Sequence, residues 1–244
     1  MTEGVTTPPQ VIWHDLECGS YEADLPLWRA LAGEAAGPVL DIGCGTGRVA
    51  VDLARRGHDV CGLDRDPVLL AALRERAGGL AVETIEADAR DFELGRRFAL
   101  CVVPMQTAQI LGGPAGRQDL LRCVCRHLEP GAVLAIALAD ALEGFDAGSQ
   151  RLPPPDTAVH EGVLYSSQPV SVREDGDAVE VRRLRRTRGP EGAMSADEDL
   201  VRLERLTGEE LAAEADPLGL TALPLRRIEP TVEHVGSAVV MLRA

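Results

Sequence analysis

The sequence contains no lysine and no asparagine, so all 25 of its basic residues are arginine. The absence of lysine excludes a Schiff-base lysine and the lysine of a P-loop, and the absence of asparagine excludes N-linked glycosylation. None of the six cysteines belongs to a Cys-x-x-Cys pair, so nothing suggests a structural zinc site. Cysteines inside apolar runs are typical of a reducing compartment, and we expect a cytoplasmic protein.

Long apolar runs are also absent. The longest, residues 132–139, is far too short to span a bilayer, and the first ten residues, "MTEGVTTPPQ", lack the basic and apolar regions of a signal peptide. The net charge of −14 repels phosphate backbones. We therefore expect no membrane and no nucleic acid among the partners. At 244 residues the chain is long enough for an α/β domain with an insertion.

The first half of the chain alternates short apolar runs with amphipathic segments. The apolar runs predict strands at 38–43, 59–64, 80–87, 98–104 and 132–139. Helices are expected at 48–57, after the N-cap pair Asp66-Pro67, and at 118–127. Strands that are apolar throughout and separated by helices predict a parallel sheet with helices on both faces.

The pattern changes after the proline-rich stretch 151–156. Strand-like runs joined by short turns predict an antiparallel meander at 163–173, 178–186 and 199–206. The capping box "TGEE" at 207–210 then opens a helix. Two final strands are expected at 221–228 and 236–243, the first parallel to the earlier strands and the last antiparallel to them.

These elements predict two units. The core comprises residues 1–150 and 207–244, and its first 35 residues form an N-terminal cap segment. Residues 151–206 form an inserted antiparallel meander, which enters after the fifth strand and serves as a lid or as a dimer contact. We expect a monomer or a homodimer.

Three glycines, Gly43, Gly45 and Gly47, follow the first strand in "VLDIGCGTGR". Glycine loses much backbone entropy on folding, so this cluster suggests that a ligand must approach the backbone closely. The spacing is GxGxG rather than the GxGxxG of dinucleotide-binding sheets. Asp64, at the tip of the second strand, can accept hydrogen bonds from ribose hydroxyls, and Asp88, which ends the third strand, can reach an adenine amino group.

This set of motifs resembles the class I S-adenosylmethionine-dependent methyltransferases. The resemblance rests on Asp41-x-Gly-x-Gly-x-Gly, Asp64, Asp88-Ala89 and the turn "LEPGA" at 128–132, and it covers about residues 20–140. It implies a doubly wound, Rossmann-like sheet of seven strands, mostly parallel, with an antiparallel last strand. It also implies S-adenosyl-L-methionine as cofactor. Ala99 departs from the family, which often has aspartate there; this position lies at the far end of the sheet, where we expect no catalytic consequence.

The resemblance assigns roles to the glycine loop and its surroundings. Residues 43–47, including Cys44, would let the backbone approach the methionine and ribose parts of the cofactor. Asp41 would order the loop and hold the cofactor's ammonium group through water. Pro104, at the end of the fourth strand, would lie near the sulfonium, and Tyr21 would fold over the cofactor. Tyr21 could equally be a core residue.

The adenosine part is assigned to the next two strand ends. Asp64 would take the ribose diol, and Arg65 would pack beside the adenine. Asp88 and the backbone N–H of Ala89 would read the adenine edge. Each acid has a simpler interpretation, Asp64 as a helix N-cap and Asp88 as an ordinary loop acid. Asp66-Pro67 already supplies the N-cap, which favours the binding role of Asp64.

The acceptor is expected to be a small molecule, with O- or N-methylation and a secondary metabolite as one possible class. The stretch "VVPMQTAQ" at 102–109 lacks the (D/N)PPY motif of methyltransferases that act on DNA, RNA or release factors. No acidic cluster suggests a metal, because Asp64 and Asp88 are committed to the cofactor. Two alternatives stay open. One is a member of this fold that uses the cofactor for other chemistry or as a structural ligand; the other is an NAD-dependent oxidoreductase, disfavoured by the GxGxG spacing.

Two histidines are candidates for a catalytic base. His234 lies in the turn before the last strand, and His14 precedes the Tyr21 segment; both are expected at the mouth of the pocket. Imidazole titrates near neutral pH and can accept a hydroxyl proton. Either histidine could instead be a surface or structural residue, and an amine acceptor needs no base.

The run "RRLRRTR" at 182–188 is the main basic feature of the second half. On a strand, Arg182 and Arg186 share one face, and Arg183 and Arg185 share the other. A solvated strand and recognition of an anionic acceptor are both compatible with this pattern.

Overall fold

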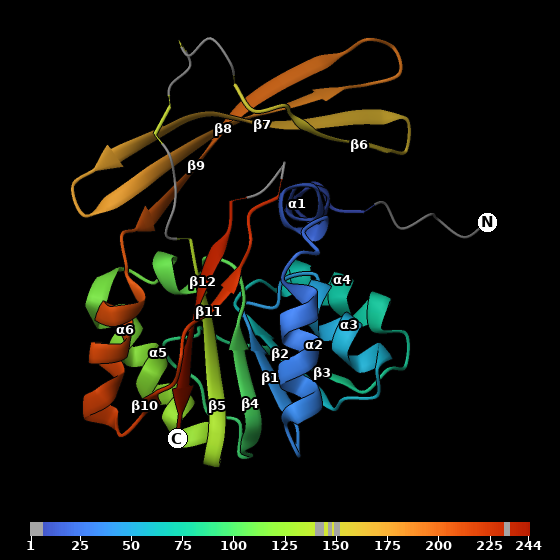
Figure 1. Ribbon diagram of the computed structural model, residues 1–244. Coiled ribbons are helices and arrows are strands. Elements are labelled where there is room, and N and C mark those ends of the chain that lie inside the picture. Colours follow the sequence, from blue (N-terminus) through green and yellow to red (C-terminus); the bar gives the residue numbers. More distant parts are fainter. Residues whose placement is uncertain (1–6, 140–143, 146–147, 149–151, 232–234) are drawn as a thin grey trace.

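The computed structural model describes residues 7–139, 144–145, 148, 152–231 and 235–244, and within them the chain forms two β-sheets, one above the other (Figure 1). The first sheet has the strand order β10-β12-β5-β4-β1-β2-β3, with β11 also paired to β12; the second has the order β6-β7-β8-β9. The strands of the first sheet are β1 Val39–Ile42, β2 Val60–Asp64, β3 Val82–Glu86, β4 Phe98–Val103, β5 Leu128–Leu138, β10 Thr221–Ala222, β11 Arg226–Ile228 and β12 Ser237–Arg243. Those of the second are β6 Asp156–His160, β7 Val163–Asp175, β8 Ala178–Arg188 and β9 Met194–Glu204.

The first five strands are parallel and end at the same edge. β1 lies between β2 and β4, with Asp41 level with Gly62 and Val102. β12 runs antiparallel to β5, and β10 and β11 run antiparallel to β12, so both are parallel to β5. The expected sixth strand is therefore split into two short pieces. The predicted α/β class, with an antiparallel last strand and a separate antiparallel sheet, is confirmed.

Helices cover both faces of the first sheet (Figure 1). One face packs against α5 Gly113–His127 and α6 Gly208–Ala215, and the other against α2 Leu25–Glu34, α3 Arg48–Arg55 and α4 Pro67–Ala77. Alternate residues of β1 serve the two cores, since Leu40 belongs to the first and Val39 to the second. Burial on both faces explains why β1 is apolar at every position except Asp41.

Local signals in the sequence set several helix boundaries. The Asp66 side chain accepts hydrogen bonds from the backbone of Val68 and Leu69, and so caps α4 as predicted. Thr207 and Glu210 form the predicted capping box at α6. α5 begins at Gly113 rather than at 118, because Pro114 occupies a position in the first turn that tolerates proline. Among the described residues, no helix has both the length and the apolar character needed to cross a membrane.

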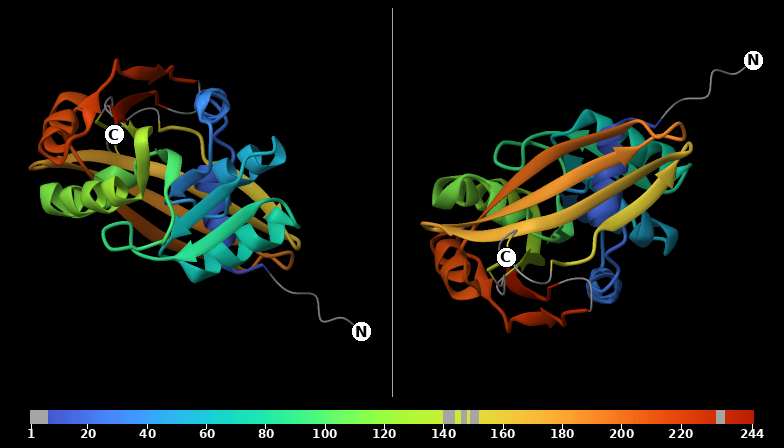
Figure 2. Two further views of the ribbon diagram at one scale, coloured as in Figure 1. Left: turned by 90° about the horizontal axis from the view of Figure 1, so that it is seen from below. Right: turned by 90° about the horizontal axis from the view of Figure 1, so that it is seen from above.

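The second sheet lies across the carboxyl-end edge of the first (Figures 1 and 2). Its three long strands lie where the meander was predicted, but β6 was not expected and β9 begins at Met194. β6 is short and only half buried, so its sequence carries little strand signal. The helix α1 Pro9–His14 and the π-helical turn η1 Asp15–Gly19 lie between the two sheets.

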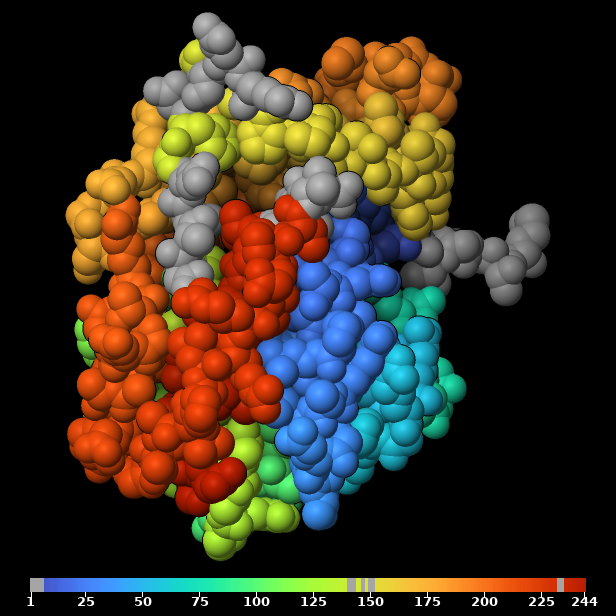
Figure 3. All heavy atoms as spheres, in the orientation of Figure 1, coloured from blue at the N-terminus to red at the C-terminus, as the bar shows by residue number. Residues whose placement is uncertain are grey.

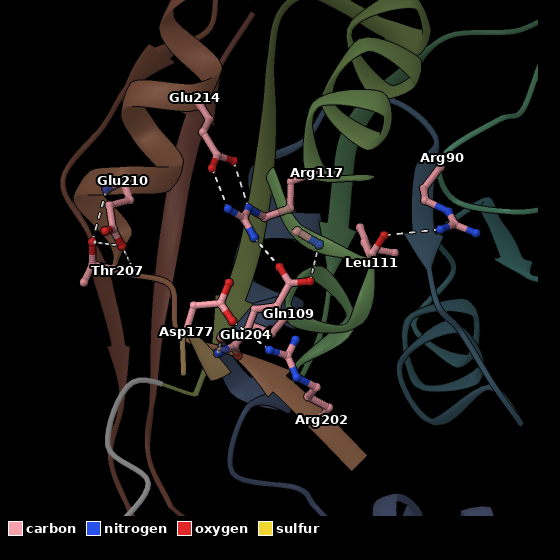
Figure 4. A network of polar contacts seen from close by, with 11 residues as sticks. Arg90, Gln109, Leu111, Arg117, Asp177, Arg202, Glu204, Thr207, Glu210 and Glu214 are labelled. Carbon is pink, nitrogen blue, oxygen red and sulfur yellow. Dashed lines mark hydrogen bonds and ion pairs between the residues drawn. The ribbon is translucent and has the colours of Figure 1, made fainter. Parts of the chain in front are cut away.

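A buried polar network joins the end of the second sheet to the core (Figure 4). Arg117 of α5 donates to Glu214 of α6 at 2.9 and 2.6 Å, and it also binds Glu204 at the end of β9. The Gln109 side chain donates to the carbonyl oxygens of Ala139 (3.1 Å) and Glu204 (2.9 Å), and accepts from the Ala139 amide at 2.8 Å. The return of the chain from β9 is thus anchored beside the end of β5.

Candidate functional site

The glycine loop after β1 has a backbone that other residues adopt only with strain. Gly43, Gly45 and Gly47 have φ angles of 71°, 53° and 92°. A Cβ at each position would also overlap another part of the chain: Thr107 at Gly43, His14 at Gly45 and Leu73 at Gly47. The sequence suggested that an outside ligand requires these glycines. The structure adds a second reason for glycine at these positions, because three other segments of the chain pack directly against the loop.

Asp41 is fully buried next to this loop. Neither carboxylate oxygen has a hydrogen-bond partner among the described residues. Burial raises the pKa of Asp41 from 3.8 to about 7, partly offset by the positive charge of Arg48 and by a weaker contact with the backbone amide of Ala50. A buried carboxylate without partners is costly, so this site has unused capacity to accept hydrogen bonds from a bound molecule or water.

Asp64 stands at the carboxyl end of β2, half-buried, and contacts the loop directly. Its Oδ2 accepts from the Gly45 amide at 2.8 Å, and its Oδ1 accepts from the Asp66 amide at 3.0 Å. Each oxygen keeps a further acceptor position, since a carboxylate has about four lone-pair sites. Asp64 therefore orders the loop while remaining able to bind a hydroxyl pair. Arg65, which follows it, is exposed.

Asp88 lies just beyond β3 and is engaged by its own neighbour. Arg90 donates to its Oδ1 at 2.9 Å and to its Oδ2 at 2.6 Å, and these hydrogen bonds lower the pKa of Asp88 to about 2. Asp88 is thus a carboxylate at neutral pH. It and Ala89 are half-buried, at the edge where β1, β2 and β4 also end.

Tyr21 is buried, with 5% of its surface exposed, and packs in the core beneath α2. The Arg48 guanidinium lies 5.3 Å from the centre of its ring and donates to its backbone oxygen at 2.6 Å. Both interpretations of Tyr21, as a core residue and as a residue that folds over the cofactor, therefore stay predictions.

The segment after β4 returns toward the glycine loop. Pro104 is buried, and Met105 has a φ of 56°, which is unfavourable for a side chain of its size. The Thr107 hydroxyl donates to the Pro104 carbonyl at 3.1 Å and packs against Gly43. Strained backbone of this kind is concentrated at functional sites, and no sequence motif predicted it here.

Of the two candidate bases, the structure describes His14 but not His234. His14 is at the end of α1, over Gly45, and its Nδ1 lies 3.3 Å from the Thr46 hydroxyl. His234 lies outside the described residues. His127 is buried, where its Nε2 accepts from the Leu94 amide at 3.0 Å, and it belongs to the core.

The N-terminal segment is bound to the core next to the loop. Asp15 accepts a hydrogen bond from the Thr46 hydroxyl at 2.7 Å and forms an ion pair with Arg76 of α4, with an Nη2–Oδ2 distance of 2.5 Å. Burial opposes ionisation, but the hydrogen bonds from Arg76, His14 and Thr46 hold the pKa of Asp15 well below its usual range. Sequence reasoning missed Asp15 and Arg76, because they are 61 positions apart and carry no motif.

The same segment is bound to the second sheet. Glu17 accepts from Arg185 at 2.8 and 2.6 Å and from Ser167 at 2.6 Å. The Trp13 and Tyr165 rings meet edge to face, with centres 5.1 Å apart. Arg185 shares a face of β8 with Arg183, as the alternation predicted; the acidic partner in η1 was not predictable from the sequence.

A cavity of about 320 Å³ lies between the two sheets, near the polar network of Figure 4. Gln109 and Ala139 line it from the core, and Val179 and Leu203 from the second sheet. Its volume is at the lower end of the range for small-molecule sites. Within the described part of the chain, no group of three or more histidine, cysteine or acidic side chains is arranged to hold a metal ion.

Residues 39–131 match the protein family described as a methyltransferase domain. With the sheet order and the loop described above, this region is a methyltransferase domain of the class I S-adenosylmethionine-dependent type.

Two curated relatives illustrate the range of similarity. A cypemycin N-terminal methyltransferase from a Streptomyces species is 32% identical over 110 residues, which are 45% of this chain and 45% of that protein. The dTDP-3-amino-3,6-dideoxy-alpha-D-glucopyranose N,N-dimethyltransferase of Streptomyces fradiae is 27% identical over 199 residues, 82% of this chain and 76% of that protein. The chain spans about half the length of the first and of other curated relatives that it matches.

Among solved structures, an amino pentose methyltransferase from Micromonospora echinaspora, determined with bound S-adenosylmethionine, has a TM-score of 0.70 to this chain. The two are 20% identical, and the alignment covers 100% of each. At this identity the likeness concerns the fold, including the second sheet.

Proposed function

We propose that this chain transfers a methyl group from S-adenosyl-L-methionine to the amino group of a small molecule, and that an amino sugar is the acceptor. For the cofactor, the observation that carries the proposal is the hydrogen bond that Asp64 accepts from the Gly45 amide, beside the buried carboxyl group of Asp41. Three acidic residues, Asp41 in β1, Asp64 at the end of β2 and Asp88 just beyond β3, would suit a cationic cofactor with a ribose.

The residues present fit the cofactor. Asp64 would hold the ribose hydroxyls, Asp88 with the Ala89 amide the adenine, and Asp41, directly or through water, the ammonium group. The glycine loop from Gly43 to Gly47 would face the methionine part. When bound, the cofactor supplies an activated methyl group on a sulfonium, a good leaving group.

The protein's own task is then to align a nucleophile and to exclude water. The second sheet and the N-terminal segment cover the edge of the first sheet where the cofactor would lie, which supports water exclusion. The space-filling view shows this cover on one face of the molecule (Figure 3). The cavity between the sheets offers room for a small acceptor.

The choice of an amine acceptor rests on the relatives. The S. fradiae protein, whose alignment covers most of both chains, is named as an amino-sugar N,N-dimethyltransferase. A neutral amine can be methylated by proximity and desolvation alone. His14 is the described histidine placed to accept a proton near the glycine loop, and we propose it as the base where the acceptor is protonated. His234 is kept as a second candidate.

The test uses the purified protein with methyl-labelled S-adenosylmethionine and a panel of nucleotide-linked sugars. Each amino sugar is matched with the sugar that has a hydroxyl in place of the amine. We expect label in the amino sugars, with a product mass raised by one methylene for each transfer. Transfer to the hydroxyl sugars alone would overturn N-methylation, and cofactor binding without transfer to any sugar would overturn the acceptor class.

The base is tested with His14→Ala and His234→Ala. Both variants should bind S-adenosylhomocysteine within about twofold of the wild type, whereas the true base loses roughly 10²–10⁴ in turnover. Near-full turnover in both variants would contradict base catalysis by these histidines. The rate would then come from the alignment of the acceptor with the methyl group.

A further inference from the structure

Residues 13–19, here called the bridge segment, contact both the glycine loop and the second sheet. On the core side, His14 lies against Gly45 and Asp15 binds Thr46, the residue after Gly45. On the other side, Glu17 binds Arg185 and Ser167. In Figure 3 the yellow part of the second sheet lies directly above this blue segment.

The core side is held by charged hydrogen bonds. Arg76 donates to both oxygens of Asp15, at 2.8 and 2.5 Å, and to the Thr46 carbonyl at 3.4 Å. Because Asp64 accepts from the amide of Gly45, Asp64 and His14 meet the same glycine from two directions. The position of the bridge segment therefore affects the surface on which the cofactor would lie.

The other side is held by Glu17. Its carboxylate is mostly buried, at 12% side-chain exposure, and it accepts a bidentate pair of hydrogen bonds from Arg185. Burial alone would raise its pKa, but hydrogen bonds from Arg185 and Ser167 lower it below its usual value. The Arg185 guanidinium also lies 5.6 Å from the centre of the Trp13 ring, so one arginine contacts the bridge segment at both Trp13 and Glu17.

Asp15 and Glu17, which make these contacts, both belong to the π-helical turn Asp15–Gly19. π-Helical turns are rare and are found mostly at functional sites, because the wider turn costs hydrogen-bond geometry that other contacts must offset. Here the turn directs Asp15 to the core and Glu17 to the second sheet, although only one residue separates them.

We propose that Glu17 is a positioning residue: its contact with Arg185 and Ser167 holds the bridge segment, and through it Asp15, against Thr46 of the glycine loop, so that the second sheet controls how tightly the cofactor is retained. This inference rests on the proposed function. Glu17 itself touches neither cofactor nor acceptor in this arrangement. It acts through the segment that it fixes.

The test compares Glu17→Gln, Arg185→Gln and the double variant by calorimetry with S-adenosylhomocysteine. Each single change should weaken binding about five- to twentyfold, a typical size for coupling between two sites. The double variant should be no weaker than Arg185→Gln, because both lose the contact with Glu17 together with the ion pair of Arg185 with Asp199 of β9 (2.9 Å). Trp13 fluorescence in the free protein should change in all three, since its contacts with Arg185 and Tyr165 loosen.

The matched control is Glu180→Gln, which removes a hydrogen bond from Arg182 (3.2 Å) on the other face of β8. It should leave both the affinity and the fluorescence unchanged. Thermal unfolding separates positioning from general destabilisation: the inference requires weaker binding at an unfolding midpoint close to that of the control.

Three results would count against the inference in different ways. Wild-type affinity in Glu17→Gln would overturn the role of Glu17 while leaving the proposed function intact. Absence of S-adenosylhomocysteine binding in the wild-type protein would overturn the proposed function and this inference with it. Additive losses in the double variant would show that the two residues act separately, and would also overturn it.

Discussion

Arg48 and Asp24 form a buried ion pair directly below the glycine loop. The Arg48 guanidinium donates to the two oxygens of Asp24 at 2.5 and 2.7 Å, and the side chains are 11% and 1% exposed. The pair joins the start of α3 to the start of α2. Arg48 stands in the motif position where a dinucleotide-binding loop has its last glycine, so this loop ends on a structural arginine instead.

Asp24→Ala should therefore destabilise the protein by roughly 3–5 kcal/mol, because it leaves a buried guanidinium without its partner. Urea unfolding measures the loss. The control is Asp52→Ala, which breaks a pair with Arg29 between the same two helices, at 34% and 19% exposure. That change should cost about 1 kcal/mol or less. If the two variants lost the same free energy of unfolding, burial would not be what makes the Arg48–Asp24 pair important.

Asp64→Ala should weaken S-adenosylhomocysteine binding by roughly 1.5–3 kcal/mol, the usual value of hydrogen bonds to a charged group. Asp66→Ala is the matched control, because it removes the cap of α4 two residues away. It should cost about 1 kcal/mol of stability with little change in affinity. Calorimetry that finds unchanged affinity in a folded Asp64→Ala protein would refute the ribose assignment.

Asp41 should make stability depend on pH. An acid whose pKa is higher in the folded than in the unfolded state holds its proton more tightly when folded. Its contribution is therefore complete below the unfolded pKa of 3.8 and is lost as the pH rises through about 7. The span between these two values corresponds to roughly 4 kcal/mol.

The measurement compares wild type with Asp41→Asn by urea unfolding at several pH values. The variant cannot ionise at this position, so the stability of the wild type relative to it should fall across that range. A constant difference would mean that Asp41 is ionised throughout and has a partner in solution.

The β6–β7 turn offers a stabilising substitution. Glu161 has a φ of 48° and is followed by Gly162 at 79°, a pair of positive values typical of a tight hairpin turn. Glu161→Asn should raise stability by up to about 1 kcal/mol, because asparagine tolerates this conformation better than glutamate. Glu191→Asn, in the β8–β9 turn and without positive φ, should give no such gain in thermal unfolding.

The parallel sheet was predictable because its strands are short and apolar throughout, and because Asp66-Pro67 and the capping box mark helix starts by local chemistry. β6 and the split into β10 and β11 were not predictable. Most of their residues are exposed or half-exposed, and their strand character comes from pairing with β7 and β12 rather than from their own pattern. The local sequence predicts such strands poorly, because contacts with other strands determine whether they form.

The candidate site also contains features that the sequence predicts and features that it does not. Asp64 and Asp88 were placed correctly at strand ends, because parallel strands bring their carboxyl ends to one edge. His14 was named for its neighbourhood, and its contact with Gly45 was not foreseen. The ion pairs of Asp15 with Arg76 and of Glu17 with Arg185 join residues far apart in sequence, and no spacing rule predicts a contact of that kind.

The side chain of Gln109 binds the backbone at Ala139 and at Glu204, the two points where the chain leaves the first sheet and returns to it. The 64 residues between these points are thus a loop whose ends are held side by side. Closing such a loop depends weakly on its length, since doubling it costs only about 0.6 kcal/mol. The inserted segment can therefore change in length at little cost in folding free energy, and such a change would alter what is held against the cofactor edge.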